Sequence, residues 1–154
     1  SAIEAVSISS NGLTVAIGSR GYDDGSTKNV GRTRVVTYDG TNWVRKGFDI
    51  HGDQEDALAG FSVSMSANAE ILAVGSAYYD ATELSPNNGL TQVYIYEGSD
   101  WVQHSIDMIG ESGYDESGSA VSLSKDGQTV AIGAPHSRDR SGHVRVYHMD
   151  FTED

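Results

Sequence analysis

Val6-Ser7-Ile8-Ser9 returns twice along the chain, as Val63-Ser64-Met65-Ser66 and as Val121-Ser122-Leu123-Ser124. A second pattern follows each copy: Val15-Ala16-Ile17-Gly18, then Leu72-Ala73-Val74-Gly75, then Val130-Ala131-Ile132-Gly133. The copies begin 57 and then 58 residues apart. A fixed period of this size indicates stacked copies of one supersecondary unit, none of which can bury its apolar faces alone.

The first copy predicts four short strands. They cover residues 5–9, 14–19, 32–38 and 43–50. Apolar and small residues alternate with period two, and Asn11-Gly12 and Asp39-Gly40 supply the turn signals of hairpins. No segment shows helical spacing of apolar residues for more than a turn. The pattern therefore predicts an all-β chain of four-stranded antiparallel meanders.

The two faces of each meander differ in side-chain size. One face carries Val, Ile, Leu and Met, and the other carries Ser, Ala and Gly. A large face can pack on the small face of the next copy, as blades do in a propeller. The alternative is a two-sheet sandwich, but its outward faces would carry charge. We predict one repeat domain over 1–154, with blades at about 3–58, 59–116 and 117–154, the last lacking its fourth strand.

Aromatic residues also recur with the blade period. Trp43 and Trp101 open the fourth strand, while Tyr38, Tyr96 and Tyr147 close the third. Recurrence in each blade indicates a packing role, so we expect these rings in the core rather than on a ligand-binding surface. Asp49 and Asp107 recur in the same way at the end of the fourth strand. We expect them to have a structural role, accepting backbone N–H bonds at the crossover.

The third copy resembles the FG-GAP (integrin-α-like) β-propeller repeat family, in its branch without calcium. The resemblance rests on Ser119–Pro135 and Gly142–Tyr147, and weaker copies extend it along the chain. The family's Phe-Gly pair appears only as Ala59-Gly60 and Ser117-Gly118. The resemblance implies a propeller fold used for adhesion, ligand binding or scaffolding. The family's calcium loop is not carried over, because the turns between strands one and two hold at most one or two acids.

Composition excludes several classes of function. The chain holds 22 Asp and Glu against 10 Lys and Arg, a net charge of −12, and no Cys. An acidic surface repels nucleic-acid phosphates and anionic lipid, so we expect neither as a partner. No apolar run is long enough for direct membrane insertion. No nucleophile elbow, metalloprotease, P-loop or dinucleotide motif occurs, so we predict no enzymatic activity and no cofactor.

Three blades are fewer than the four to eight that close a propeller. They would leave two apolar blade faces uncovered. Either the chain is part of a longer one, or copies associate to complete a ring, or it packs onto other subunits of a large assembly. A mass in dilute solution of a well-behaved 16.4-kDa monomer would contradict all three explanations.

A meander places its short hairpins at one end and its long connections at the other, where we expect binding. The candidate residues are Tyr22, Asp23, Asp24, Asp53, Glu55, Asp56, Tyr78, Tyr79, Asp80, Glu83, Tyr114, Asp115, Arg138 and Asp139, with Glu111 and Glu116 among the further acids. We predict an acidic rim that binds a protein or a glycan, in an extracellular or cell-surface adhesion module. A Ca²⁺ ion at Asp23-Asp24 or at Asp53, Glu55 and Asp56 is an alternative, as is a rim whose acids only keep the protein soluble. Two further alternatives are a structural subunit docking through its blade faces and the accessory propeller of a larger hydrolase.

Overall fold

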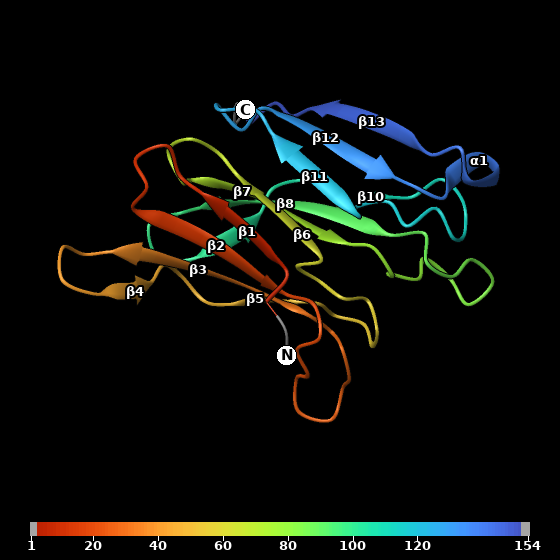
Figure 1. Cartoon of the computed structure of the whole chain (residues 1–154), viewed down its shortest axis with the longest axis horizontal. Helices are drawn as coiled ribbons and strands as arrows, with labels where there is room; N and C mark the ends of the chain where they lie inside the picture. Colours follow the sequence, from red (N-terminus) through yellow and green to blue (C-terminus); the bar gives the residue numbers. More distant parts are fainter. Residues whose placement is uncertain (1–2, 152–154) are drawn as a thin grey trace.

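The computed structural model describes residues 3–151, apart from the side chains of Arg138 and Asp139. It is all-β, with three antiparallel meander sheets that lie side by side in chain order (Figure 1). Blade 1 comprises β1 (Ala5–Ile8), β2 (Thr14–Ser19), β3 (Arg32–Tyr38), β4 (Trp43–Arg45) and β5 (Ile50–His51). Blade 2 comprises β6 (Ser62–Met65), β7 (Ile71–Ser76), β8 (Leu90–Tyr96), β9 (Trp101–Gln103) and β10 (Met108–Ile109). Blade 3 comprises β11 (Ala120–Leu123), β12 (Thr129–Ala134) and β13 (His143–His148).

The predicted strands two and three of blade 1 match β2 and β3 residue for residue, and strand one ends one residue early. The predicted fourth strand is wrong as a single element, because β4 and β5 pair with opposite ends of β3. Gly47 lies between them with φ of +74°, a left-handed conformation that interrupts the ladder. Blade 3 has three strands within the described residues. A four-residue helix, α1 (Ser137–Arg140), lies in the long connection between β12 and β13.

The blades stack large face on small face, as the alternation predicted. Ala16 and Val35 on blade 1 share a core cluster with Met65, Leu72 and Val74 on blade 2. The opposite face of blade 2 supplies Ala73, Val93 and Met108 to a second cluster with Val130 and Ile132 of blade 3. Ala16, Ala73 and their neighbours are small, so the adjacent sheet can approach closely enough to bury Leu72 and Ile132 completely.

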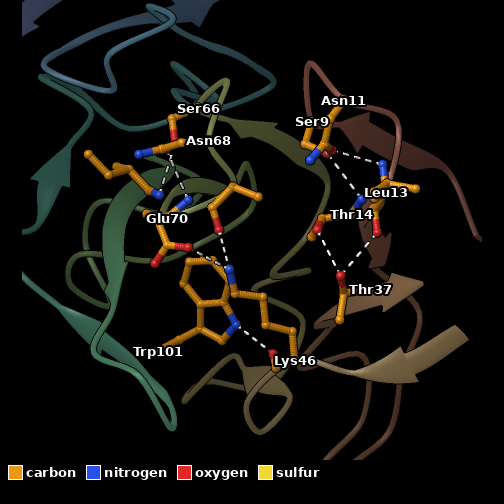
Figure 2. Close-up of polar contacts among 12 residues, drawn as sticks. Ser9, Asn11, Leu13, Thr14, Thr37, Lys46, Ser66, Asn68, Glu70 and Trp101 are labelled. Carbon is orange, nitrogen blue, oxygen red and sulfur yellow. Dashed lines mark hydrogen bonds and ion pairs between the residues drawn. The ribbon is translucent and has the colours of Figure 1, made fainter. Parts of the chain in front are cut away.

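The two equivalent tryptophans lie in different surroundings. Trp101 is 7% exposed and its Nε1 donates to the Lys46 carbonyl of blade 1 at 2.8 Å. Figure 2 shows this indole lying against Lys46, whose ammonium also contacts Glu70. Trp43 is 51% exposed and Tyr38 is 38% exposed, so the prediction that the repeated rings lie in the core is right for Trp101 and wrong for Trp43 and Tyr38. The reason is position: blade 2 has blade 1 beside it on this side, whereas Trp43 belongs to the outermost sheet.

The hairpin turns between strands one and two are built by one repeated device (Figure 2). Ser66 Oγ donates to Asn68 Oδ1 at 2.7 Å and accepts the Ile71 N–H at 3.0 Å. Ser9 and Asn11 make the same bonds in blade 1. The last serine of the repeated motif therefore organises the turn that follows it, which explains its recurrence in each copy.

Asp49 and Asp107 have the structural role predicted from their recurrence, with different partners. Asp49 accepts two hydrogen bonds from the Arg34 guanidinium, at 2.9 and 2.6 Å. Asp107 accepts from the side-chain amides of Gln92 and Gln103. The expected backbone N–H donors are therefore replaced by side chains of the neighbouring strands.

Candidate functional site

The long connections form one continuous layer at one end of the blades. We call this layer the loop rim. It consists of residues 20–31, 52–60, 77–89, 110–118 and 135–142. In Figure 1 it lies beyond the ends of β2, β7 and β12, with α1 at its blade 3 end. The candidate residues selected from the sequence all belong to these segments, so the structure brings them to one end of the molecule.

Each crossover runs beside the preceding loop of its own blade and is bonded to it. Asp56 N–H donates to the Lys28 carbonyl at 3.0 Å, and Leu58 N–H donates to the Asn29 carbonyl at 3.1 Å. The equivalent bonds in the next blade join residues 114 and 116 to residues 86 and 87. Asp56, Leu58 and Asn29 all have positive φ, and so do the equivalent residues of blade 2. Since this unusual conformation recurs in both blades, it belongs to the repeat architecture rather than to a single active site.

Side chains then join one blade's crossover to the next blade's loop. Gln54 pairs reciprocally with the backbone of Asp80: its Oε1 accepts the N–H at 2.8 Å and its Nε2 donates to the carbonyl at 3.1 Å. One blade further, His136 Nδ1 lies 3.1 Å from Glu116 Oε1. These contacts make the rim a single connected surface across all three blades.

Several of the candidate acids hold the loops in shape. Asp23 accepts the Asn29 N–H at 2.9 Å and the Lys28 ammonium at 3.0 Å, and these bonds, in that order, lower its pKa. Asp80 accepts the Asn87 N–H at 2.7 Å. Asp115 is only 3% exposed and accepts the Ser112 N–H at 3.0 Å, so it lies inside the rim rather than on its surface. These three carboxylates accept backbone N–H groups of their own loops and therefore stabilise the loop conformations.

Other acids remain on the surface. Asp24 is exposed and lies 3.4 Å from His51 Nδ1. Asp53, Glu55 and Glu83 are exposed and form no ion pair with a Lys, Arg or His whose side chain the structure describes. Asp56 is exposed too, and accepts a hydrogen bond from the Asn29 amide at 2.7 Å. The rim therefore presents unneutralised negative charge to solvent.

The candidate tyrosines divide into packed and open rings. Tyr22 lies 5.2 Å from the His51 ring and 4.3 Å below the Arg32 guanidinium. Tyr78 packs 6.0 Å from Phe61, and burial raises the pKa of Tyr79, with Asp53 adding to the effect. These three rings are partly buried.

Tyr114, in contrast, is 63% exposed. It lines a hollow of about 260 Å³ together with Glu116, His136 and Arg140. This is the part of the rim where an aromatic face, a carboxylate and two basic groups converge. His136 and Arg140 were not among the residues selected from the sequence. No sequence motif marks the short helix α1 or the contact between His136 and Glu116. Arg138 and Asp139 belong to α1, but their side chains lie outside the described part of the chain.

Among the described side chains, no group of three or more His, Asp and Glu residues is placed to hold a metal ion. Asp23 and Asp56 instead satisfy donors of the loops themselves.

One contact has the composition of a nucleophile and its base. Ser137 Oγ is hydrogen-bonded to His143 Nδ1 at the end of α1. Ser137 is buried, and His143 Nε2 is buried without a hydrogen-bond partner among the described atoms. A catalytic serine must reach a substrate and its histidine must be oriented by a third group. Ser137 of this pair is buried, and the hydrogen bond joins the start of α1 to the start of β13.

Within residues 3–151, no helix has the length and apolar character to cross a membrane. No protein-family model matches the chain, and a search of curated proteins gives no match either.

Proposed function

We propose that this chain is a non-enzymatic binding module whose loop rim docks a positively charged surface of a partner protein. The observation that carries the proposal is the set of exposed rim acids without a described cationic partner. Asp53 and Glu55 lie on the crossover of blade 1, and Glu83 lies on the long loop of blade 2. Because Gln54 bonds that crossover to that loop, these charges are held on one surface.

Charge of one sign concentrated on a rigid surface raises the association rate of an oppositely charged partner and fixes its orientation. The net charge of −12 adds a favourable long-range field for the same class of partner. The rim is also suited to docking mechanically, since its loops are bonded to each other and lose little freedom on binding. The resemblance to FG-GAP repeats that the sequence motifs suggest would imply adhesion at an extracellular or cell surface, and we include that role in the proposal.

A glycan is a second candidate, favoured by one feature. The hollow at Tyr114 offers an exposed aromatic face beside Glu116, His136 and Arg140. Binding sites of this kind combine an apolar wall with a few polar groups that fix orientation. A glycan ligand would depend on Tyr114 and be insensitive to salt, whereas a basic protein would depend on the acids.

Fluorescence anisotropy with a labelled decalysine peptide tests the first proposal, and a decaglutamate peptide is the control probe. We expect saturable binding of decalysine that weakens as salt rises, because exposed charge pairs are screened. Glu55→Lys and Glu83→Lys should each weaken binding. Glu97→Lys makes the same change in net charge at the hairpin end, between β8 and β9, and should have a smaller effect. Equal effects of all three variants would show that only the overall charge matters and would refute a rim site.

A further inference from the structure

In the part of the chain that the structure describes, the two outermost sheet faces are exposed and carry apolar side chains. On blade 1, Val6 is 68% and Ile8 is 61% exposed. On blade 3, Val144 and Val146 are each 66% exposed. The equivalent positions inside the stack are buried: Val63 and Met65 correspond to the blade 1 pair, and Thr33 and Val35 to the blade 3 pair. The exposure is therefore a consequence of position in the stack and not of residue type.

The two open faces are opposite halves of one interface. At both internal interfaces, the small face of one blade receives the large face of the next. Blade 1 leaves a large face open, with Val6 and Ile8, and blade 3 leaves a small face open, with Ala120, Ser122 and Gly133. Each open face therefore matches the other and does not match itself.

The hydrogen bonds across the two internal interfaces also repeat. The groups that would make the next bond of the same kind lie on the two open faces. Ser7 Oγ accepts the Met65 N–H at 3.0 Å, and Ser64 Oγ accepts the Leu123 N–H at 2.9 Å. The next donor and acceptor in this series are the Ile8 N–H on blade 1 and Ser122 Oγ on blade 3. A backbone series behaves in the same way. Residue 10 donates to the carbonyl of residue 67, and residue 67 donates to that of residue 125.

A glycine shows where the next blade would sit. A Cβ on Gly18 would overlap the Gly60 carbonyl oxygen of the following blade, and a Cβ on Gly75 would overlap that of Gly118. Within residues 3–151 the equivalent Gly133 has no following blade beside it, and a Cβ there would meet Ala120 Cβ as its nearest atom, at 3.5 Å. Around it is an open, mainly apolar hollow of about 470 Å³, lined in part by Ala120, Gly133 and Val144. The space beside Gly133 is therefore empty in the described part of the chain, whereas a glycine carbonyl of the following blade occupies the equivalent space at both internal interfaces.

We propose that a second copy of this chain covers these faces head to tail, with blade 3 of each copy packed on blade 1 of the other. Two such contacts related by a two-fold axis close a ring of six blades. Six lies within the range of about four to eight blades that form closed propellers, whereas one copy gives three and three copies give nine. In this dimer the large face of blade 1 packs on the small face of the partner's blade 3. The same kinds of face, and the same repeat positions, already form the two interfaces inside the chain.

Sedimentation velocity on the chain, from micromolar to submillimolar concentration, tests the proposal. We expect a reversible dimer of twice 16.4 kDa. Gly133→Ala adds a methyl group where the second copy should sit, and its own blade accommodates it. Ile8→Glu places a charge on the other open face. Each should weaken dimerisation by about 30-fold or more, as loss of a central interface contact does. Leu84→Glu, an equally drastic change on the exposed rim, should leave the dimer intact. Circular dichroism should show that every variant remains folded.

Mixing the two defective variants distinguishes head-to-tail pairing from other arrangements. The mixture contains one intact contact, between the unaltered blade 3 of Ile8→Glu and the unaltered blade 1 of Gly133→Ala, so dimers should reappear in part. A monomer at all concentrations would overturn the proposal. It would also be overturned by a series of ever larger open assemblies, or by a dimer sensitive to Ile8→Glu alone. None of these outcomes bears on decalysine binding at the rim.

Discussion

Replacing each of the two equivalent tryptophans by alanine tests whether packing between blades stabilises this protein. Trp101→Ala removes a ring that is 7% exposed and that spans the interface between blades 1 and 2. Truncation of a buried Trp costs about 3–5 kcal/mol. For a domain of this length that corresponds to a fall of roughly 6–20 °C in Tm. Trp43→Ala makes the same chemical change at the same repeat position, where the ring is 51% exposed. We expect a loss of about 1 kcal/mol there, or roughly 2–4 °C.

The assay is thermal unfolding followed by far-ultraviolet circular dichroism, at one fixed protein concentration because self-association shifts Tm. Urea unfolding provides the free energies. Trp101→Phe isolates the indole hydrogen bond, since it keeps an aromatic ring but leaves the Lys46 carbonyl without its donor. That variant should lose about 1–3 kcal/mol. If Trp43→Ala and Trp101→Ala differ by less than about 1 kcal/mol, the stacking of blade 2 on blade 1 is not the cause of the burial, and the reasoning fails.

Three further predictions follow from other parts of the stack. Gly18→Ala should lower the free energy of unfolding by about 3 kcal/mol, because the added Cβ would overlap the backbone of blade 2. A loss below about 0.5 kcal/mol in urea unfolding would show that the two blades do not approach so closely. Ser66→Ala should cost about 1–3 kcal/mol, because the partly buried Ile71 N–H loses its acceptor, and Ser26→Ala, at an exposed loop position, serves as control. The hydrogen bonds from Arg34 lower the pKa of Asp49 in the folded protein. The charged carboxylate therefore stabilises the fold at pH values above the unfolded pKa of about 3.9. This stabilisation is lost as the pH falls through the lower pKa of the folded state. The destabilisation by Asp49→Asn, about 2 kcal/mol at pH 7, should therefore shrink in urea titrations below pH 4, and a difference independent of pH would contradict the assignment.

The sequence was sufficient for every feature that depends on local alternation. The period-two pattern of Val15 and Ile17 against Ala16 and Gly18 specified strand, face and partner, because successive side chains of a strand must point to opposite sides. It was insufficient where a backbone irregularity intervened. The fourth strand breaks at Gly47 in blade 1, and nothing in the alternation of that short segment predicted the break.

The candidate site was predicted less completely than the fold. The sequence placed the acidic residues on one rim, because a meander must alternate its connections between two ends. It could not tell that Asp115 is buried as a loop acceptor while Glu83 is exposed. Carboxylates look alike in a sequence, and their roles are decided by which N–H groups the folded loops bring near them. His136 and Arg140 joined the site for the same reason, through α1.

By itself, the sequence determined the repeat, the strands and the two unlike faces of each sheet, since these follow from residue size and order along one chain. Tertiary structure alone decided which copies of a repeated residue are buried. Trp43 and Trp101 occupy the same repeat position, as do Gly18 and Gly133, yet their environments differ. The physical reason is that burial depends on the neighbour beyond the sheet, and a position at the end of a stack has its neighbour on one side only.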